Sequence, residues 1–279
     1  MHRRQWRGLE TAGLTNATPR LLCIGTHHKT GTVWMRRVWR ELAQTLDLPF
    51  IGIHRPGIWR EKVPETGRAV IVNWGGKFAP DLWEQEDARF MHVIRDPRDV
   101  LLSGARYHDS TNAPTEKWLY KPRADLDGRS YQQHMQSLPH QSDKLMFEMG
   151  EMHLKTLNEM RSWPYGHERA FDIRYEDLIV DTDCALFKKA LSFMGMSAAE
   201  IEAGAKIFYD NSIFGGLAAN PSEGRTKTHV KSGKPAQWIT KLPETVAERY
   251  LQAHGQDLIA LGYEEDGSWI GRLRPQEAA

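Results

Sequence analysis

Runs of consecutive apolar residues alternate along this chain with segments in which apolar residues recur every three or four positions. A short apolar run predicts a buried strand, and the three-to-four spacing predicts a helix with one face in the core. The predicted strands are 21–25, 49–53, 69–73, 90–95 and 169–174. Because helical patterns separate them, we predict an α/β fold with helices packed around a parallel sheet.

The two clearest helices are predicted over 31–46 and 143–160. In the first, Val33, Trp34, Val38, Leu42 and Leu46 recur at helical spacing, and Pro49 follows where a helix should stop. The second carries a methionine-rich stripe of Leu145, Met149, Met152 and Leu157. We interpret that stripe as core packing, because methionine fills irregular gaps in hydrophobic cores.

Two long spans are polar and irregular. Span 107–140 contains three prolines and is long for a connection inside a domain, so it is interpreted as a lid or substrate loop, with a surface excursion as the alternative. Span 211–237 combines four glycines and two prolines with Arg225, Lys227 and Lys231. Flexible backbone with several cations predicts a flap over an anion.

Composition narrows the class of protein. The 279 residues, 40% of them hydrophobic, can bury one large core, although two folding units are also possible. Lysine and arginine total 37 against 36 aspartate and glutamate residues. The chain therefore lacks the excess of positive charge that would predict a nucleic-acid partner. The two cysteines argue against a disulfide scaffold. With no apolar run of membrane length, we expect a cytoplasmic protein without a membrane partner.

The stretch CIGTHHKTGTVWMRRVWREL, which starts at Cys23, joins the first predicted strand to the first predicted helix. The first amides of such a helix point at one spot and favour an anion there. Lys29, Thr30, Gly31, Thr32 and Val33 line that spot. A nucleotide-hydrolysing P-loop places its lysine after the last glycine, whereas Lys29 precedes Gly31, so the stretch is not a standard P-loop.

A second segment, HVIRDPRDVLLSGARYH, also passes from a predicted strand to a predicted helix. Arg95 and Ser103 lie eight residues apart in it, and both can reach an anion at the carboxyl end of the strand. That edge is where open α/β sheets bind their ligands. The two segments together therefore predict one site for a compact anionic ligand.

These residues resemble a known family. KTGTVW is similar to the 5′-phosphosulfate loop of sulfotransferases that use 3′-phosphoadenosine-5′-phosphosulfate (PAPS), and Arg95 and Ser103 match that family's 3′-phosphate motif. The resemblance implies a P-loop-like three-layer fold with a central parallel sheet flanked by helices, PAPS as donor, 3′-phosphoadenosine 5′-phosphate (PAP) as product, and no metal. It implies a sulfotransferase domain over 20–265 between tails at 1–19 and 266–279.

Further segments extend the resemblance. DIRYEDL matches a family segment that places Tyr175 in the adenine site, and Trp34 stands at the family's adenine-stacking position, with a core role as the alternative for both residues. HVKSGKPAQW is similar to the family's late 3′-phosphate segment. By this resemblance the remaining nucleotide-binding candidates are Ser212, Phe214, Arg225, Lys231, Ser232 and Gly233.

The implied reaction moves a sulfuryl group to a hydroxyl or amine of a small-molecule acceptor, with Lys29 stabilising the leaving group. The family usually places a histidine base before the 3′-phosphate arginine, but the corresponding position, 22 residues before Arg95, is Asn73. Asparagine cannot act as a general base. Our leading substitute is His54, with His28 and His108 as competitors.

Other interpretations stay open from the sequence. A small-molecule kinase shares the sheet and the anion-binding helix but would need the missing P-loop order and a magnesium ligand. A binder of phosphoadenosine nucleotides that has lost its chemistry is consistent with Asn73. Several aromatic residues in loop-like segments could line an acceptor pocket or pack the core: Trp59, Trp74, Trp83, Trp118 and Tyr120. The oligomeric state is not determined.

Overall fold

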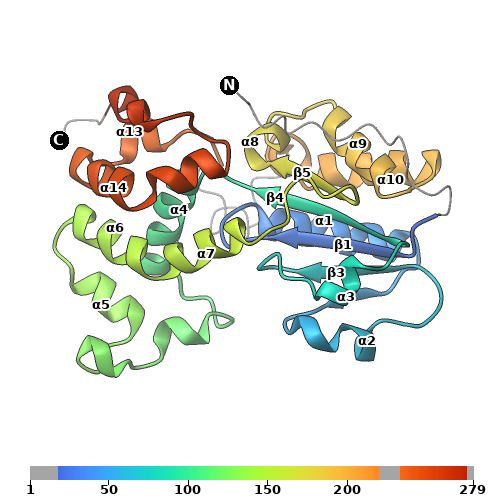
Figure 1. Cartoon of the computed structure of the whole chain (residues 1–279), viewed down its shortest axis with the longest axis horizontal. Coiled ribbons are helices and arrows are strands. Elements are labelled where there is room, and N and C mark those ends of the chain that lie inside the picture. Colours follow the sequence, from blue (N-terminus) through green and yellow to red (C-terminus); the bar gives the residue numbers. More distant parts are fainter. Residues whose placement is uncertain (1–17, 220–232, 275–279) are drawn as a thin grey trace. The chain divides into compact units, whose positions relative to one another are not determined.

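A five-stranded sheet in which every neighbouring pair is parallel forms the centre of the α/β part of the chain (Figure 1). The computed structural model of the protein describes residues 18–219 and 233–274. The strands are β1 (Leu21–Thr26), β2 (Phe50–Gly52), β3 (Ala69–Asn73), β4 (Ala88–Ile94) and β5 (Ala170–Arg174), in the spatial order β2-β3-β1-β4-β5. The five predicted strands are confirmed, with ends that differ by no more than two residues.

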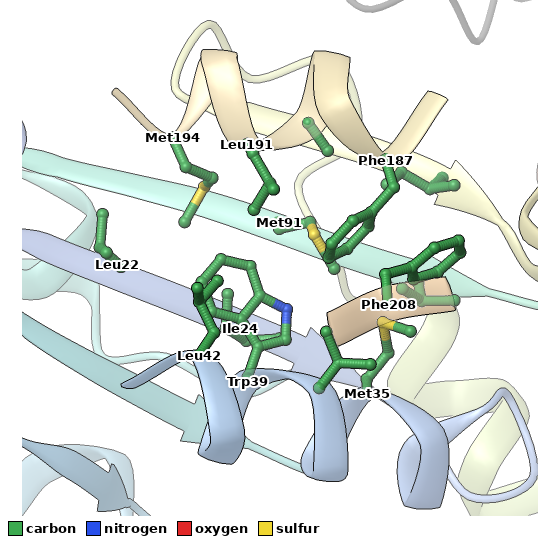
Figure 2. Close-up of a cluster of buried hydrophobic side chains, with 14 of the residues drawn as sticks. Leu22, Ile24, Met35, Trp39, Leu42, Met91, Phe187, Leu191, Met194 and Phe208 are labelled. Carbon is green, nitrogen blue, oxygen red and sulfur yellow. The ribbon is translucent and has the colours of Figure 1, made fainter. Parts of the chain in front are cut away.

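Helices cover both faces of this sheet, because the side chains of each strand alternate between two cores. Leu22 and Ile24 point into one core together with side chains from α1 (Thr32–Thr45), α9 (Ala185–Phe193) and α10 (Ala198–Asp210) (Figure 2). Leu21 and Cys23 point into the other core, against α2 (Trp59–Lys62) and α3 (Pro80–Trp83). The prediction of a three-layer α/β fold with a flanked parallel sheet is confirmed.

The chain divides into two compact units. Of the described residues, the first unit comprises 18–95, 162–219 and 233–234, and the second comprises 96–161 and 235–274. The sheet and its helices belong to the first unit, which also contains η1 (Pro56–Ile58), α8 (Tyr175–Leu178) and α11 (Gly216–Ala219).

The second unit is helical. Its helices are α4 (Pro97–Ser110), α5 (Tyr131–Ser137), α6 (Gln141–Gly150), α7 (Met152–Arg161), α13 (Trp238–Lys241) and α14 (Glu244–Ala260), with the short turns η2 (Lys117–Tyr120), η3 (Ala124–Leu126) and η4 (Gly267–Arg272). Their shared core includes Leu101, Leu145, Trp238, Tyr250 and Trp269. Parts of the chain far apart in sequence thus build one apolar cluster.

The prediction of one long helix over 143–160 is wrong. The helix is interrupted at Glu151, whose backbone angles, φ −111° and ψ −108°, are not helical. The Glu151 carboxylate accepts a hydrogen bond of 2.8 Å from Nη1 of Arg123, a contact that residue spacing does not reveal. Leu145, Met149 and Leu157 are nevertheless buried, which confirms that the stripe packs a core.

Residues 107–140 contain the end of α4, the turns η2 and η3, and α5. The start of α5 is held by a capping box, in which the Ser130 and Gln133 side chains each bond the other's backbone N–H. The interpretation of this span as a lid or substrate loop stays a prediction. Of the flap expected over 211–237, residues 220–232 lie outside the described residues.

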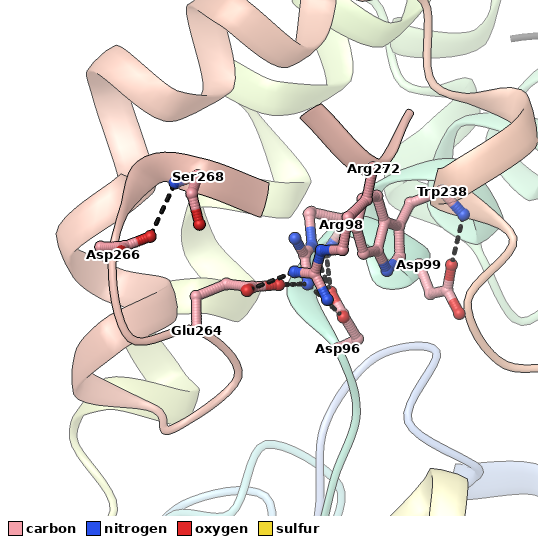
Figure 3. A network of polar contacts seen from close by, with 8 residues as sticks. All are labelled: Asp96, Arg98, Asp99, Trp238, Glu264, Asp266, Ser268 and Arg272. Atoms are coloured by element: carbon pink, nitrogen blue, oxygen red, sulfur yellow. Dashed lines mark hydrogen bonds and ion pairs between the residues drawn. The ribbon is translucent and has the colours of Figure 1, made fainter. Parts of the chain in front are cut away.

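A buried ion cluster lies at the start of α4 in the second unit (Figure 3). Arg98 donates to both carboxylate oxygens of Asp96, through Nε at 3.0 Å and Nη2 at 2.7 Å, and its Nη2 lies 2.5 Å from Oε1 of Glu264. The guanidinium also lies over the Trp238 ring, 3.6 Å from its centroid. Burial lowers the pKa of Arg98, but the two carboxylates outweigh that effect and raise it above its usual value.

Candidate functional site

The loop between β1 and α1 is closed by hydrogen bonds to one backbone carbonyl. The carbonyl oxygen of His27 accepts from the Thr30 amide at 3.2 Å, from the Thr30 hydroxyl at 3.0 Å and from the Thr32 hydroxyl at 2.6 Å. Thr30 Oγ1 also accepts from the His27 amide at 2.9 Å. These short-range bonds fix the loop as a tight turn around Lys29.

Two residues of this loop adopt left-handed backbone conformations. Gly31, the N-cap of α1, has φ 97°, and Lys29 has φ 63°. A left-handed conformation costs a residue with a side chain roughly 1–2 kcal/mol, and such strain concentrates at binding sites and active sites. Lys29 is therefore held in an unfavourable conformation by its surroundings, at the entrance to a helix N-terminus.

The N-terminus of α1 is suited to an anion. No side chain caps its first turn, and the amide of Met35 is the first to bond back to Gly31, at 3.0 Å. The amides that precede it in a helix lack intrahelical acceptors and carry the positive end of the helix dipole. The predicted anion site therefore has the required backbone geometry.

Arg95 brings the second predicted segment to this loop. It follows β4, which pairs with β1, and its Nη1 donates to the Lys29 carbonyl at 3.2 Å. The Arg95 guanidinium lies over the Tyr175 ring, 4.6 Å from the centroid. Two segments separated by 66 positions therefore meet at the carboxyl ends of two neighbouring strands, where open α/β sheets bind ligands.

Tyr175 packs directly against the loop. A β-carbon added to Gly31 would lie 3.1 Å from Cδ2 of Tyr175, and the Tyr175 hydroxyl donates to the carbonyl of Gly233 at 2.9 Å. Gly233 is thereby connected to the loop and Arg95 through a buried tyrosine. The structure brings together Lys29, Gly31, Arg95, Tyr175 and Gly233.

Trp34 and its neighbours form an aromatic cluster at the first turns of α1. The Trp34 ring stacks on Phe208 at 4.7 Å between centroids and meets Tyr175 and Phe214 edge-on at 6.5 and 6.1 Å. Trp34 thus packs against the core, which was the alternative to adenine stacking for this residue. Ser212 is buried, and its hydroxyl donates to the Tyr209 carbonyl at 2.8 Å, which is a bond within its own turn.

The remaining predicted nucleotide ligands belong to the second unit or lie outside the described residues. Ser103 is half-buried on α4, and it belongs to the second unit. Arg225, Lys231 and Ser232 lie outside the described residues.

Asn73 has a structural role at the end of β3. Its Nδ2 donates to the Ile53 carbonyl at 2.7 Å, and its Oδ1 accepts from the amides of Gly75 and Lys77 at 2.9 and 3.0 Å. The side-chain amide therefore builds the turn that follows β3. This arrangement accounts for asparagine at a position where the resemblance leads one to expect a histidine.

The three histidines proposed as bases have different environments. His54 is exposed after β2, and His28 is half-buried in the loop. His108 is buried on α4 of the second unit, with its Nδ1 2.8 Å from Oε2 of Glu148. Glu148 also accepts from the Tyr131 hydroxyl at 2.7 Å, so His108 belongs to a buried polar network there.

A histidine pair beneath the loop was missed by the sequence analysis. Nε2 of His27 lies 2.8 Å from Nε2 of His92, and Nδ1 of His92 lies 3.2 Å from Oδ1 of Asp172. Burial, then His92 and Lys77, lower the pKa of His27, and burial lowers that of His92 although Asp172 opposes it. The available sequence signal was the alternation of β4, which places a polar histidine among apolar neighbours in a buried strand.

Most of the aromatic residues suggested for an acceptor pocket have partners in the cores. Trp59 and Trp83 pack in the second core of the sheet, where Trp83 stacks on Phe90 at 3.7 Å. Trp118 packs on Tyr131 in the second unit, and Tyr120 is partly exposed there. Trp74 is half-buried against the first core.

Among residues 18–219 and 233–274, no group of three or more histidine, cysteine, aspartate or glutamate side chains is placed to hold a metal ion. The same described ranges contain no helix long and apolar enough to cross a membrane.

No family model and no curated protein matches this chain. Among solved structures, retinol dehydratase in a complex with retinol and PAP is similar, with a TM-score of 0.50 and 13% identity over 89% of this chain and 84% of that one. Retinol dehydratase with androsterone and inactive cofactor PAP gives a TM-score of 0.48 and 14% identity, covering 89% and 84% of the two chains. A mouse sulfotransferase complexed with PAP gives 0.46 and 15%, covering 88% of each chain. At such identities, the likeness to the first of these supports the fold alone.

Proposed function

We propose that this chain is a sulfotransferase that uses PAPS as donor and a small molecule with a hydroxyl or amine as acceptor. One observation carries the proposal: the Arg95 guanidinium donates to the Lys29 carbonyl, so the two segments predicted to bind an anion are in direct contact, which supports a single site. An isolated helix N-terminus is common in α/β proteins. A strained lysine at that terminus together with an arginine from the neighbouring strand is a far more specific arrangement.

The residues present fit such a donor. The first amides of α1, Thr32 and Lys29 suit a 5′-phosphosulfate, while Arg95 suits the 3′-phosphate, with Ser103, Arg225, Lys231 and Ser232 as further candidates. Aromatic surface for an adenine is offered by Tyr175, Trp34 and Phe214. Gly233 accepts a hydrogen bond from Tyr175, and Ser212 lies two positions before Phe214 in the sequence. The donor supplies the sulfuryl group.

Lys29 is assigned the catalytic role. Negative charge develops on the oxygen that leaves sulfur, and an ammonium carried by a loop that is closed by hydrogen bonds is suited to stabilise that charge. In-line transfer requires the nucleophile, sulfur and leaving oxygen to be held in position, which the closed loop favours. His54 remains a candidate for the base.

Calorimetric titration of the purified chain tests this proposal. We expect PAP to bind tightly, adenosine 5′-phosphate to bind much more weakly because it lacks the 3′-phosphate, and magnesium-ATP not to compete. The site is assigned by repeating the PAP titration with Arg95→Gln, which retains polarity but not charge. Preference for magnesium-ATP over PAP would replace the proposal with a kinase. Tight PAP binding without turnover of any acceptor would identify a binder that has lost its chemistry.

A further inference from the structure

The buried chain of His27, His92 and Asp172 connects the loop to the far edge of the sheet. His27 directly follows β1, His92 lies in β4 and Asp172 lies in β5, so one side chain comes from each of three adjacent strands. His27 and His92 have no exposed surface. This series of hydrogen-bonded side chains continues to Trp163, whose Nε1 donates to Asp172 Oδ1 at 2.7 Å and whose ring stacks on His92 at 4.0 Å.

The hydrogen-bond partners determine where the protons lie. The Asp172 carboxylate only accepts, so Nδ1 of His92 carries a proton and donates it. Neutral His92 then has its lone pair on Nε2, which must accept from Nε2–H of His27. Neutral His27 is left with a lone pair on Nδ1, and that atom has no hydrogen-bond partner among the described residues.

This arrangement can take up one proton without breaking a hydrogen bond. The proton enters at His27 Nδ1, and the proton on Nε2 can then move to His92, whose positive charge would be paired with Asp172. An Asp–His–His chain therefore stabilises an imidazolium at a distance from the atom that receives the proton. An isolated buried histidine lacks that stabilisation.

His27 is itself part of the loop at the candidate site, through its backbone. His27 lies two positions before Lys29, and its backbone carbonyl accepts hydrogen bonds from the hydroxyls of Thr30 and Thr32. Its ring lies under the turn built by Asn73, where a β-carbon on Gly76 would approach ring atom Cε1 to 2.6 Å. The charged and titratable groups acting on the pair are Lys77 from that turn, and Asp172 from β5.

We propose that His27 Nδ1 is the proton acceptor of the reaction, with His92 and Asp172 as positioning residues; this inference rests on the proposed sulfotransferase function. The acceptor's O–H bond breaks as its oxygen forms a bond to sulfur, the sulfur bond to the 5′-phosphate oxygen breaks with its electron pair, and the proton passes to His27 Nδ1. Because the ring is fully buried here, the turn at residues 73–77 must yield for the acceptor to reach it. The imidazole belongs to His27, directly after β1, whereas the turn that covers it follows β3.

The first test needs no acceptor. Long-range proton–nitrogen NMR spectra of the full chain labelled with ¹⁵N-histidine, assigned with His27→Asn and His92→Asn, report the tautomer of each ring. We expect His27 to be protonated on Nε2 and His92 on Nδ1. The opposite tautomers would overturn the proposal, because Nδ1 of His27 would then have no lone pair for a proton.

The second test measures turnover of a series of substituted phenols, from phenol to 4-nitrophenol, with PAPS. His27→Asn should lower kcat on the order of 100-fold with phenol, with PAP affinity unchanged within about twofold. The loss should shrink as the phenol becomes more acidic, because an acidic acceptor needs less help to lose its proton. A loss equal for all phenols would indicate a structural role and contradict the proposal.

Asp172→Asn keeps an acceptor oxygen but removes the charge. Losing the carboxylate lowers the pKa of the histidine pair, so the acidic limb of the pH–rate profile should move to lower pH while kcat falls at neutral pH. His140→Asn, on an exposed histidine before α6, is the matched control and should change neither quantity.

The outcomes separate the two proposals. If the wild-type chain does not bind PAP, the sulfotransferase proposal fails whatever the tautomers are. If PAP binds but the dependence on phenol acidity appears in His54→Asn instead of His27→Asn, the function stands and His54 is the base. In that case the inference about His27 is overturned.

Discussion

Replacing Arg98 by methionine should strongly destabilise the second unit. Arg98 is 1% exposed and lies between the carboxylates of Asp96 and Glu264, and Glu264 is also paired with Arg272, whose side chain is 52% exposed (Figure 3). The substitution leaves two largely buried carboxylates and one half-exposed guanidinium. Removing one partner of a buried ion pair costs about 3–5 kcal/mol, mainly because charge stays buried without compensation.

The expected loss of stability in Arg98→Met comes mainly from the ion pairs and less from the packing against the two tryptophans. Methionine retains much of the apolar contact with Trp238 and Trp269, so packing changes little, and the lost cation–π attraction adds roughly 1–2 kcal/mol that is not additive with the ion-pair term. Arg98→Lys is the control that keeps a charge but loses the two parallel bonds to Asp96. It should cost less than the methionine variant.

Urea denaturation followed by circular dichroism measures the change, and hydrogen exchange of amides in α4 and α14 assigns it to the second unit. Adding Asp96→Asn to Arg98→Met should recover part of the loss, because asparagine keeps the oxygen that caps α4 and removes one buried charge. A loss below about 1 kcal/mol for Arg98→Met, or no recovery in the double variant, would refute the reasoning.

Three further predictions concern the candidate site and the buried histidines. Lys29→Ala should lower kcat far more than PAP affinity, since its charge acts in the transition state; equal losses in kinetics and calorimetry would contradict that role. Arg95→Ala should reduce the preference for PAP over adenosine 5′-phosphate, and an unchanged preference would place the 3′-phosphate elsewhere. Burial, and after it the charge of His254, lowers the pKa of His153 to about 3. The contribution of neutral His153 to the free energy of unfolding is therefore complete above about pH 6.5. It decreases by roughly 1.4 kcal/mol per pH unit as the pH falls from there toward 3. His153→Gln should therefore make urea midpoints less dependent on pH across that window, and an unchanged slope would contradict a neutral buried His153.

The local sequence was sufficient to predict the strands and the first helix, because their apolar residues follow the strand and helix patterns. Strands β1, β3 and β4 are buried on both faces, β5 is mostly buried and β2 is half-buried. Helix α1 is bounded by Gly31 and Leu46, as its residue spacing predicts. The loop around Lys29 was also predictable, because the hydrogen bonds that close it connect residues three to five positions apart. The helix predicted over 143–160 is interrupted at Glu151, whose backbone is not helical and whose carboxylate accepts a hydrogen bond from Arg123, 28 positions away.

Tertiary structure decided what the polar residues do. The side chain of Asn73 donates to the Ile53 carbonyl, 20 positions away, and Arg95 reaches the loop because β4 pairs with β1. The chain of His27, His92 and Asp172 spans 145 positions, and it exists only because three parallel strands place their ends side by side. Sequence patterns report which residues are buried, whereas the proton positions in this chain depend on which buried atoms face one another.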